Sequence, residues 1–305
     1  MLHDAGVASR TDDGAASRRT LLLGAGCMTG LSAAGLLFAD PGARRGLRQV
    51  LHPVPQPPHH IPSGPTGPVT GGTLTSRAMG RPISWSVAYP PGSRPGMRLP
   101  FLLVLHGRGD NHRDVLGSHH LGSFLAATVR AGTPPFALVA VDGGNHSFWH
   151  HRKSGEDPQT MITDELIPVL AGRGLPTARF GVGGWSMGGY GALLLAERLG
   201  PVRVAVCAVD SPALWLHAGD SAPGAFDDRT DFRANDVFAQ HARFGGIPLR
   251  VACGTSDPFL SGVRAFLTAV PTAEADLSRG GHDLAFWQHA APGQLAFVGR
   301  HLGAA

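Results

Sequence analysis

One stretch of sequence decides how this chain folds: Val182-Gly183-Gly184-Trp185-Ser186-Met187-Gly188-Gly189-Tyr190-Gly191-Ala192-Leu193. It contains the pattern Gly-x-Ser-x-Gly, centred on Ser186. The residues before it, 178–183, are typical of a short buried strand, and residues 192–199 predict a helix that ends at Gly200-Pro201. A serine between a strand and a helix occupies a sharp turn, which needs flanking glycines because a side chain there would clash. The pattern therefore predicts an exposed nucleophilic serine at the end of a sheet strand.

Length and charge limit the class of protein. The chain has 305 residues, 43% of them hydrophobic, which suffices for one α/β domain once an N-terminal segment is set aside. Residues 1–51 hold six Arg and four Asp, a net charge of +2, which leaves +2 of the total of +4 for residues 52–305. No basic stripe is interleaved with aromatic residues, so we do not expect binding to nucleic acid.

The N-terminus resembles a twin-arginine export signal. Ser17-Arg18-Arg19-Thr20 is followed by an uncharged run from Leu21 to Ala39 that contains several glycines. The run also reaches the lower length limit of a membrane span, and Leu37-Phe38-Ala39 is a poor cleavage site, so a retained membrane tether through residues 21–39 is the alternative. Either way, we expect an exported protein, in the cell envelope or extracellular.

The rest of the chain divides into a linker and one domain. Residues 52–72 are rich in Pro, Gly and His, which favours extended linker chain, and residues 73–305 alternate strand and helix patterns. This alternation predicts a mostly parallel sheet of about eight strands flanked by helices. Residues 83–89 alternate at period two and predict an antiparallel edge strand, and residues 215–246 predict a cap-like insertion. The other expected strands are 101–105, 136–141, 178–183, 202–209, 247–252 and 273–277, and the other expected helices are 160–170, 258–269 and 283–302.

A nucleophilic serine needs an acid, and Asp257 is the main candidate. It follows the strand at 247–252, so its carboxylate lies at the carboxyl end of the sheet, where open α/β sheets build their sites. Asp257 also precedes Pro258 in the manner of a helix N-cap, a structural role that does not exclude catalysis. Asp210, which ends the strand after the serine helix, is the rival acid.

The base candidate is His282, which completes the chain order Ser, Asp, His. Gly280-Gly281 before it allow a sharp turn that brings the imidazole back to Ser186, where it would take the hydroxyl proton and later return it. His289 is the runner-up, but it lies inside a helix pattern.

The oxyanion of the reaction needs backbone N–H donors. The N–H of Met187 is one candidate. The segment 105–110, directly after a predicted central strand, would supply the other from Arg108 or, alternatively, Gly107.

Four aromatic residues near the predicted loop ends are candidates for the wall of a substrate pocket: Trp149, Trp185, Phe259 and Trp287. The histidine pairs in the chain match no metal-ligand spacing, so we expect no metal. Cys207 and Cys253 each end an apolar strand, which favours buried thiols but leaves a disulfide between neighbouring strands open.

From about Arg81 to Leu302 the chain resembles the putative-esterase branch of the α/β-hydrolase superfamily, which includes esterase D (S-formylglutathione hydrolase) and the antigen 85 mycolyltransferases. Residues 184–193 are similar to the esterase D nucleophile signature, with Trp185 where histidine is common; residues 253–259 and 280–282 resemble the acid and base loops. The resemblance implies an α/β-hydrolase fold, carboxylic-ester hydrolysis, no cofactor and the triad roles above. The predicted export signal departs from cytosolic esterase D, and in this respect the chain is more similar to exported actinobacterial esterases.

The sequence thus predicts a serine carboxylesterase that acts on a small-molecule or lipid ester through an acyl-enzyme. Transfer of the acyl group to a sugar or lipid alcohol with the same triad is the alternative, and a non-catalytic binding domain on a hydrolase fold is a third interpretation. The acyl chain length, the natural alcohol, signal cleavage and oligomeric state stay open at this stage.

Overall fold

A computed structural model describes residues 60–303 of the chain. The predicted export signal or anchor in residues 1–51 and the start of the predicted linker lie outside the described residues. Within residues 60–303, none of the helices combines the length and apolar character needed to cross a bilayer.

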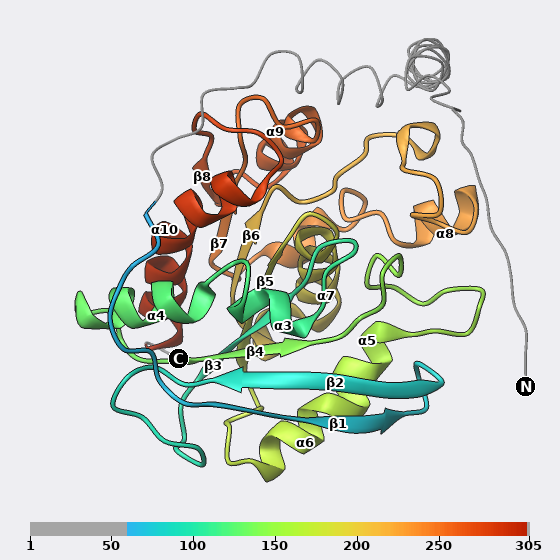
Figure 1. The fold of residues 1–305 in the computed structure, drawn as a ribbon. Helices are drawn as coiled ribbons and strands as arrows, with labels where there is room; N and C mark the ends of the chain where they lie inside the picture. The colour runs from blue at the N-terminus through green and yellow to red at the C-terminus, as the bar shows by residue number, and fades with distance from the viewer. Residues whose placement is uncertain (1–59, 304–305) are drawn as a thin grey trace, which may run out of the picture. The chain divides into compact units, whose positions relative to one another are not determined.

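The described residues form an eight-stranded, mostly parallel sheet with the order β1-β2-β4-β3-β5-β6-β7-β8 (Figure 1). The strands are β1 (Val69–Ser76), β2 (Arg81–Ala88), β3 (Phe101–Leu105), β4 (Ala137–Val141), β5 (Phe180–Trp185), β6 (Val204–Asp210), β7 (Leu249–Ala252) and β8 (Glu274–Asp276). In this order, every neighbouring pair from β4 through to β8 is parallel, whereas β1 pairs antiparallel with β2 and β2 pairs antiparallel with β4. This is the α/β arrangement that the sequence predicts.

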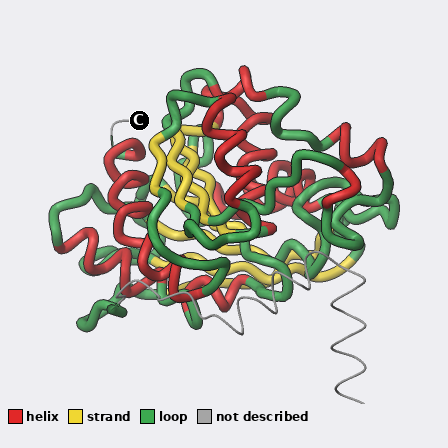
Figure 2. Tube along the Cα trace, turned by 90° about the horizontal axis from the view of Figure 1, so that it is seen from above, coloured by secondary structure: helices red, strands yellow, loops and turns green. Residues whose placement is uncertain are grey.

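Helices cover both faces of the sheet, as the tube seen from above shows (Figure 2). The α-helices are α3 (His112–Leu116), α4 (Leu121–Arg130), α5 (Pro158–Thr160), α6 (Ile167–Gly172), α7 (Met187–Arg203), α8 (Arg229–Ala234), α9 (Leu260–Ala269) and α10 (Leu284–Leu302); η1 (Met161–Leu166) is a π-helix, and η2 (Ala218–Asp220) and η3 (His241–Phe244) are 3-10 helices. One core cluster joins α4 and α10 to one face of β3, and a larger cluster joins α6, α7 and α9 to the opposite face.

The prediction of β2 as an edge strand is wrong, because β1 pairs along its outer side. The predicted linker at 52–72 therefore ends too late, since β1 begins at Val69. Gly71 and Gly72 look like linker residues, but they serve the packing of a strand. A Cβ at Gly72 would lie 3.0 Å from the indole of Trp85, its register partner on β2, so the glycine makes room for the indole.

Two smaller predictions are settled by the backbone. Gly200 has a φ of 65° and breaks the helical conformation of α7, which confirms the predicted stop at Gly200-Pro201. Cys207 and Cys253 are both buried and free. Although their strands are neighbours, Cys207 is aligned with Leu249, four residues before Cys253, so the two thiols are not opposite each other.

Candidate active site

Ser186 lies on a strained turn between β5 and α7. Its φ of 55° and ψ of −119° are far from both helix and strand values, and a non-glycine residue holds this conformation only where the surroundings enforce it. The enforcing contacts are backbone bonds: the N–H of Ser186 donates to the carbonyl of Asp210 at 3.0 Å, and the carbonyl of Ser186 accepts from Tyr190 and Ala213. The strain therefore presents the hydroxyl above the end of the sheet, as the sequence predicts.

The glycines around Ser186 permit a close approach to β3. A Cβ at Gly184 would lie 2.3 Å from the carbonyl oxygen of Leu105, and a Cβ at Gly188 would lie 1.9 Å from the same atom. Backbone atoms cannot yield to such contacts, so only glycine lets the start of α7 pack directly on the end of β3.

Two hydrogen bonds connect Ser186, His282 and Asp257. The hydroxyl of Ser186 donates to Nε2 of His282 over 2.8 Å, and Nδ1–H of His282 donates to Oδ2 of Asp257 over 2.9 Å. The carboxylate side chain is fully buried, whereas the imidazole is 20% exposed. The structure thus brings together all three residues predicted from the sequence. His282, and not His289, is the histidine in contact with the serine.

Asp257 is held by its own loop. Oδ1 accepts the N–H of Phe259 over 2.8 Å, which leaves Oδ2 for the imidazole. The alternative of Asp257 as a helix N-cap is wrong, because α9 begins at Leu260 with Phe259 at the N-cap position. The acid and base loops are also joined to each other, since Ser256 donates its N–H to the carbonyl of Gly280 over 2.9 Å.

The rival acid, Asp210, has a different environment. Its carboxylate accepts a hydrogen bond of 2.7 Å from Nε2 of Gln294 on α10. Burial raises the pKa of Asp210 to about 7, which makes it a poor anionic partner for an imidazolium at neutral pH. Oδ2 of Asp257 takes the position at the imidazole instead.

The segment that follows β3 is fixed by His106, a residue whose role the sequence reasoning missed. Nε2 of His106 accepts the N–H of Gly143 over 3.0 Å, so the proton is on Nδ1, which donates to the carbonyl of Gly107 over 2.8 Å. Burial lowers the pKa of His106 and keeps this neutral form. The carbonyl of His106 accepts the indole N–H of Trp149 over 3.1 Å.

These bonds determine where the N–H groups of the segment point. The C=O and N–H of a trans peptide point in opposite directions. Since the carbonyl of Gly107 faces the His106 ring, the N–H of Arg108 faces away from that ring. Both predicted donors of this segment, Gly107 and Arg108, therefore belong to peptide groups whose carbonyls are fixed by buried side chains.

A family model described as "Putative esterase" matches residues 76–297. The chain belongs to this esterase family. A search of curated proteins gives no match.

Solved structures share the fold of this esterase. A ferulic acid esterase has a TM-score of 0.69 at 20% identity, covering 77% of this chain and 99% of its own. An S-formylglutathione hydrolase from Agrobacterium tumefaciens has a TM-score of 0.64 at 18% identity, covering 79% of this chain and 98% of its own. Mycobacterium tuberculosis MPT51 has a TM-score of 0.61 at 20% identity, covering 78% and 99%. The family match identifies an esterase, and the solved structures show that the fold is shared.

The four aromatic residues predicted to line a pocket of this esterase divide into two pairs. Trp149 is fully buried and Trp185 is 3% exposed, so neither forms an accessible wall, and the prediction is wrong for both. The indole N–H of Trp149 donates to the carbonyl of His106, and that of Trp185 donates to the carboxylate of Asp110. Phe259 and Trp287 are half-buried and lie against the imidazole of His282, with ring centroids 5.0 and 5.2 Å from its own. This second pair contacts the imidazole of His282.

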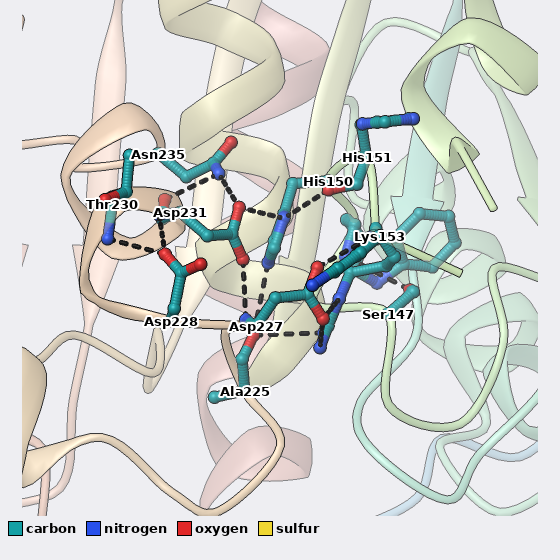
Figure 3. Close-up of polar contacts among 12 residues, drawn as sticks. Ser147, His150, His151, Lys153, Ala225, Asp227, Asp228, Thr230, Asp231 and Asn235 are labelled. Carbon is teal, nitrogen blue, oxygen red and sulfur yellow. Dashed lines mark hydrogen bonds and ion pairs between the residues drawn. The ribbon is translucent and has the colours of Figure 1, made fainter. Parts of the chain in front are cut away.

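A cap lies between β6 and β7, in the region where the sequence predicts an insertion. Buried Arg152, from the loop after β4, holds it: its guanidinium donates to the carbonyls of Gly224 and Ala225 and forms an ion pair of 2.9 Å with Asp227. The backbone N–H of Lys153 donates to the second carboxylate oxygen of Asp227 over 2.6 Å (Figure 3). The cap is therefore anchored to the loop after β4 by a partly buried, charge-assisted network.

His150 is a second anchor, and it is fully buried. Its Nε2 lies 3.1 Å from the carbonyl of Ala225 and its Nδ1 lies 3.0 Å from the carbonyl of His151 (Figure 3). Burial lowers the pKa of His150, so the neutral ring donates to one of the two carbonyls. Asp231 is 3.5 Å from Nδ1 and opposes the effect of burial.

A small hollow is lined by Tyr190 of α7 and by residues between β6 and β7 that include Leu214, Trp215, Phe226 and Phe232. The ring of Trp215 contacts that of Phe259 at 5.3 Å, and Phe259 in turn contacts His282. Trp215, which lines the hollow, is thus connected to the imidazole of His282 through the ring of Phe259. In residues 60–303, no three His, Cys, Asp or Glu side chains are grouped so that they could hold a metal ion.

Proposed function

We propose that Ser186, His282 and Asp257 are the catalytic triad of a carboxylesterase that forms an acyl-enzyme. The observation that carries the proposal is the continuous pair of hydrogen bonds from the serine hydroxyl to the buried carboxylate, on a serine held at a positive φ. A nucleophile in contact with a base, and a base in contact with an orienting acid, is the arrangement that activates a weak alcohol nucleophile.

In the first half-reaction, Oγ of Ser186 attacks the ester carbonyl carbon, and its proton passes to Nε2 of His282. Asp257 fixes the tautomer with the proton on Nδ1 and stabilises the imidazolium that forms. The tetrahedral intermediate collapses, the C–O bond to the alcohol breaks, and the leaving alkoxide takes the proton from Nε2. The acyl group stays on Ser186 as an ester.

In the second half-reaction, a water molecule attacks the acyl carbon and gives a proton to Nε2. The carboxylic acid leaves as Ser186 regains its proton. The N–H groups of Met187 and of Arg108 or Gly107 stabilise the oxyanion in both halves. This assignment of the oxyanion donors is supported by the close packing of α7 on β3 and by the fixed carbonyls of His106 and Gly107.

The substrate class is tested by turnover of p-nitrophenyl acetate, butyrate, octanoate and palmitate by the full chain. The acyl chain length that is turned over fastest reports the size of the acyl site. Addition of a sugar or lipid alcohol to the assay distinguishes hydrolysis from acyl transfer, because only transfer yields a new ester. Absence of turnover on every ester, with the protein folded, would contradict the esterase proposal.

We also propose export to the cell envelope or beyond it, with the arginine pair Arg18-Arg19 and the run Leu21 to Ala39 as the supporting sequence. Replacement of both arginines by lysine should retain the protein inside the producing cell. Fractionation of cells that express either form measures this, and unchanged export of the double variant would contradict the proposal.

A further inference from the structure

The two groups proposed to stabilise the oxyanion come from different elements. Met187 begins α7, directly after the nucleophile, whereas Gly107 and Arg108 follow β3. An oxyanion hole works only if both donors keep their separation to within a fraction of an ångström. A contact near the two donors must therefore hold the start of α7 in place relative to the segment after β3.

A partly buried hydrogen bond supplies this contact. The indole N–H of Trp185, the residue directly before Ser186, donates to Oδ2 of Asp110 over 2.9 Å. Asp110 closes the turn after β3, since its own N–H donates to the carbonyl of Gly107 over 3.3 Å. The bond thus spans 75 residues of sequence and joins the two elements beside both donors.

Gly107 is packed against both partners of this bond. A Cβ at Gly107 would lie 2.6 Å from Nε1 of Trp185 and 3.0 Å from Oδ2 of Asp110. The position of the Gly107 backbone is therefore set by the indole and the carboxylate together, and a shift of either one would move the donor segment.

His119 holds the indole from its other side. Its ring stacks on that of Trp185 with centroids 3.7 Å apart and an interplanar angle of 28°. Nε2 of His119 is 3.9 Å from Oδ2 of Asp110, but burial lowers the pKa of His119 to about 4, so this ring is neutral at pH 7. His119 thus orients the indole by packing, while the indole N–H supplies the directional bond to Asp110.

We propose that Asp110 is a positioning residue of the esterase reaction, which holds the oxyanion segment against the nucleophile turn through its hydrogen bond with Trp185. This inference rests on the proposed triad. A negative charge beside a developing oxyanion is unfavourable. The contribution of Asp110 is therefore the bond that it accepts and not its charge, which sets the proposal apart from an electrostatic role.

The test compares four variants on p-nitrophenyl acetate. Asp110→Ala and Trp185→Phe should each lower kcat by about 10- to 100-fold with KM within about threefold, because a displaced donor weakens only the transition state. Asp110→Asn keeps an acceptor oxygen for the indole and should restore kcat to within about threefold of the native enzyme. Asp114→Ala, which removes a carboxylate that binds within its own turn, is the matched control and should leave kcat unchanged.

The double variant Asp110→Ala/Trp185→Phe should be no slower than the slower single variant, since both remove the same bond. Any one of three results would overturn the proposal: a native kcat in the Asp110→Ala variant, additive losses of kcat in the double variant, or an Asp110→Asn variant as slow as the Asp110→Ala variant.

A spectroscopic measurement separates failure of this inference from failure of the proposed function. The indole N–H resonance of Trp185, assigned by its loss in Trp185→Phe, should lie downfield in the native protein and move upfield in Asp110→Ala. Absence of ester turnover in the native protein would reject the proposed function. An indole resonance that does not respond to Asp110→Ala would reject the hydrogen bond, whatever the turnover.

Discussion

The contact between Gly188 and β3 gives the sharpest quantitative prediction. A Cβ on residue 188 would lie 1.9 Å from the carbonyl oxygen of Leu105, 2.4 Å from its carbon and 2.6 Å from the carbonyl oxygen of His106. Real Cβ contacts below 3.0 Å are essentially absent, so Gly188→Ala must open the first contact by at least 1.1 Å. All three atoms are backbone, so no side-chain rotation relieves the clash.

This displacement separates the donor of Met187 from those of residues 107 and 108. A misplacement of about 1 Å in a catalytic arrangement costs on the order of 100-fold in rate. We therefore expect Gly188→Ala to lower kcat/KM for p-nitrophenyl acetate by about 100-fold or more, together with a lower melting temperature.

Gly172→Ala is the matched control for this experiment. Gly172 ends helix α6, and a Cβ there would meet nothing within 4 Å. The control should keep native kcat/KM and equal or slightly higher stability. A Gly188→Ala enzyme that stays within threefold of the native kcat/KM would refute the argument that glycine is required for the approach of α7 to β3.

Three further predictions concern the acid, a buried histidine and the cap. Asp257→Asn should lower kcat by about 10²- to 10⁴-fold in steady-state assays, whereas Asp210→Asn should stay within a fewfold; the reverse order would make Asp210 the acid. His119 has a folded pKa of about 4, below its ordinary 6.5, so its contribution to stability is complete above pH 6.5 and is lost as the pH falls from 6.5 to 4. Between pH 7 and pH 4, the free energy of unfolding measured by urea titration should therefore fall by about 3 kcal/mol less in His119→Phe than in the native protein. An unchanged pH dependence would argue against a buried neutral ring. Arg152→Met removes the donor to the carbonyls of Gly224 and Ala225 and the ion pair to Asp227, and should destabilise the protein by about 2 kcal/mol, with early proteolysis in residues 224–235. A native melting temperature and cleavage pattern would contradict this role.

The three residues of the proposed triad could be predicted because each is marked by local sequence. The turn around Ser186 and the glycines before His282 are constraints that short segments impose on themselves, and the chain order of the triad restricts the acid. Burial could not be predicted in this way. Asp210 and Asp257 both end or follow neighbouring parallel strands, and contacts from distant segments distinguish them, since Gln294 binds Asp210 whereas His282 binds Asp257.

Contacts between distant segments account for most errors. Trp149 and Trp185 are aromatic residues near loop ends, and their type alone does not show whether they face solvent or support a backbone turn. The bond between Trp185 and Asp110 joins residues 75 positions apart, so no local pattern indicates it. Strand β1 was missed because Gly71 and Gly72 make it look like linker, although a Cβ at these positions would meet the backbone and the indole of Trp85, respectively.

The most direct test of the account is the reaction of the full chain with a serine-directed fluorophosphonate, followed by intact mass and peptide mapping. The triad predicts a single adduct on Ser186 in the native protein, much slower labelling in His282→Ala, and no labelling in Ser186→Ala. An adduct on another serine, or equal labelling of Ser186→Ala, would contradict the assignment of the nucleophile and the mechanism built on it.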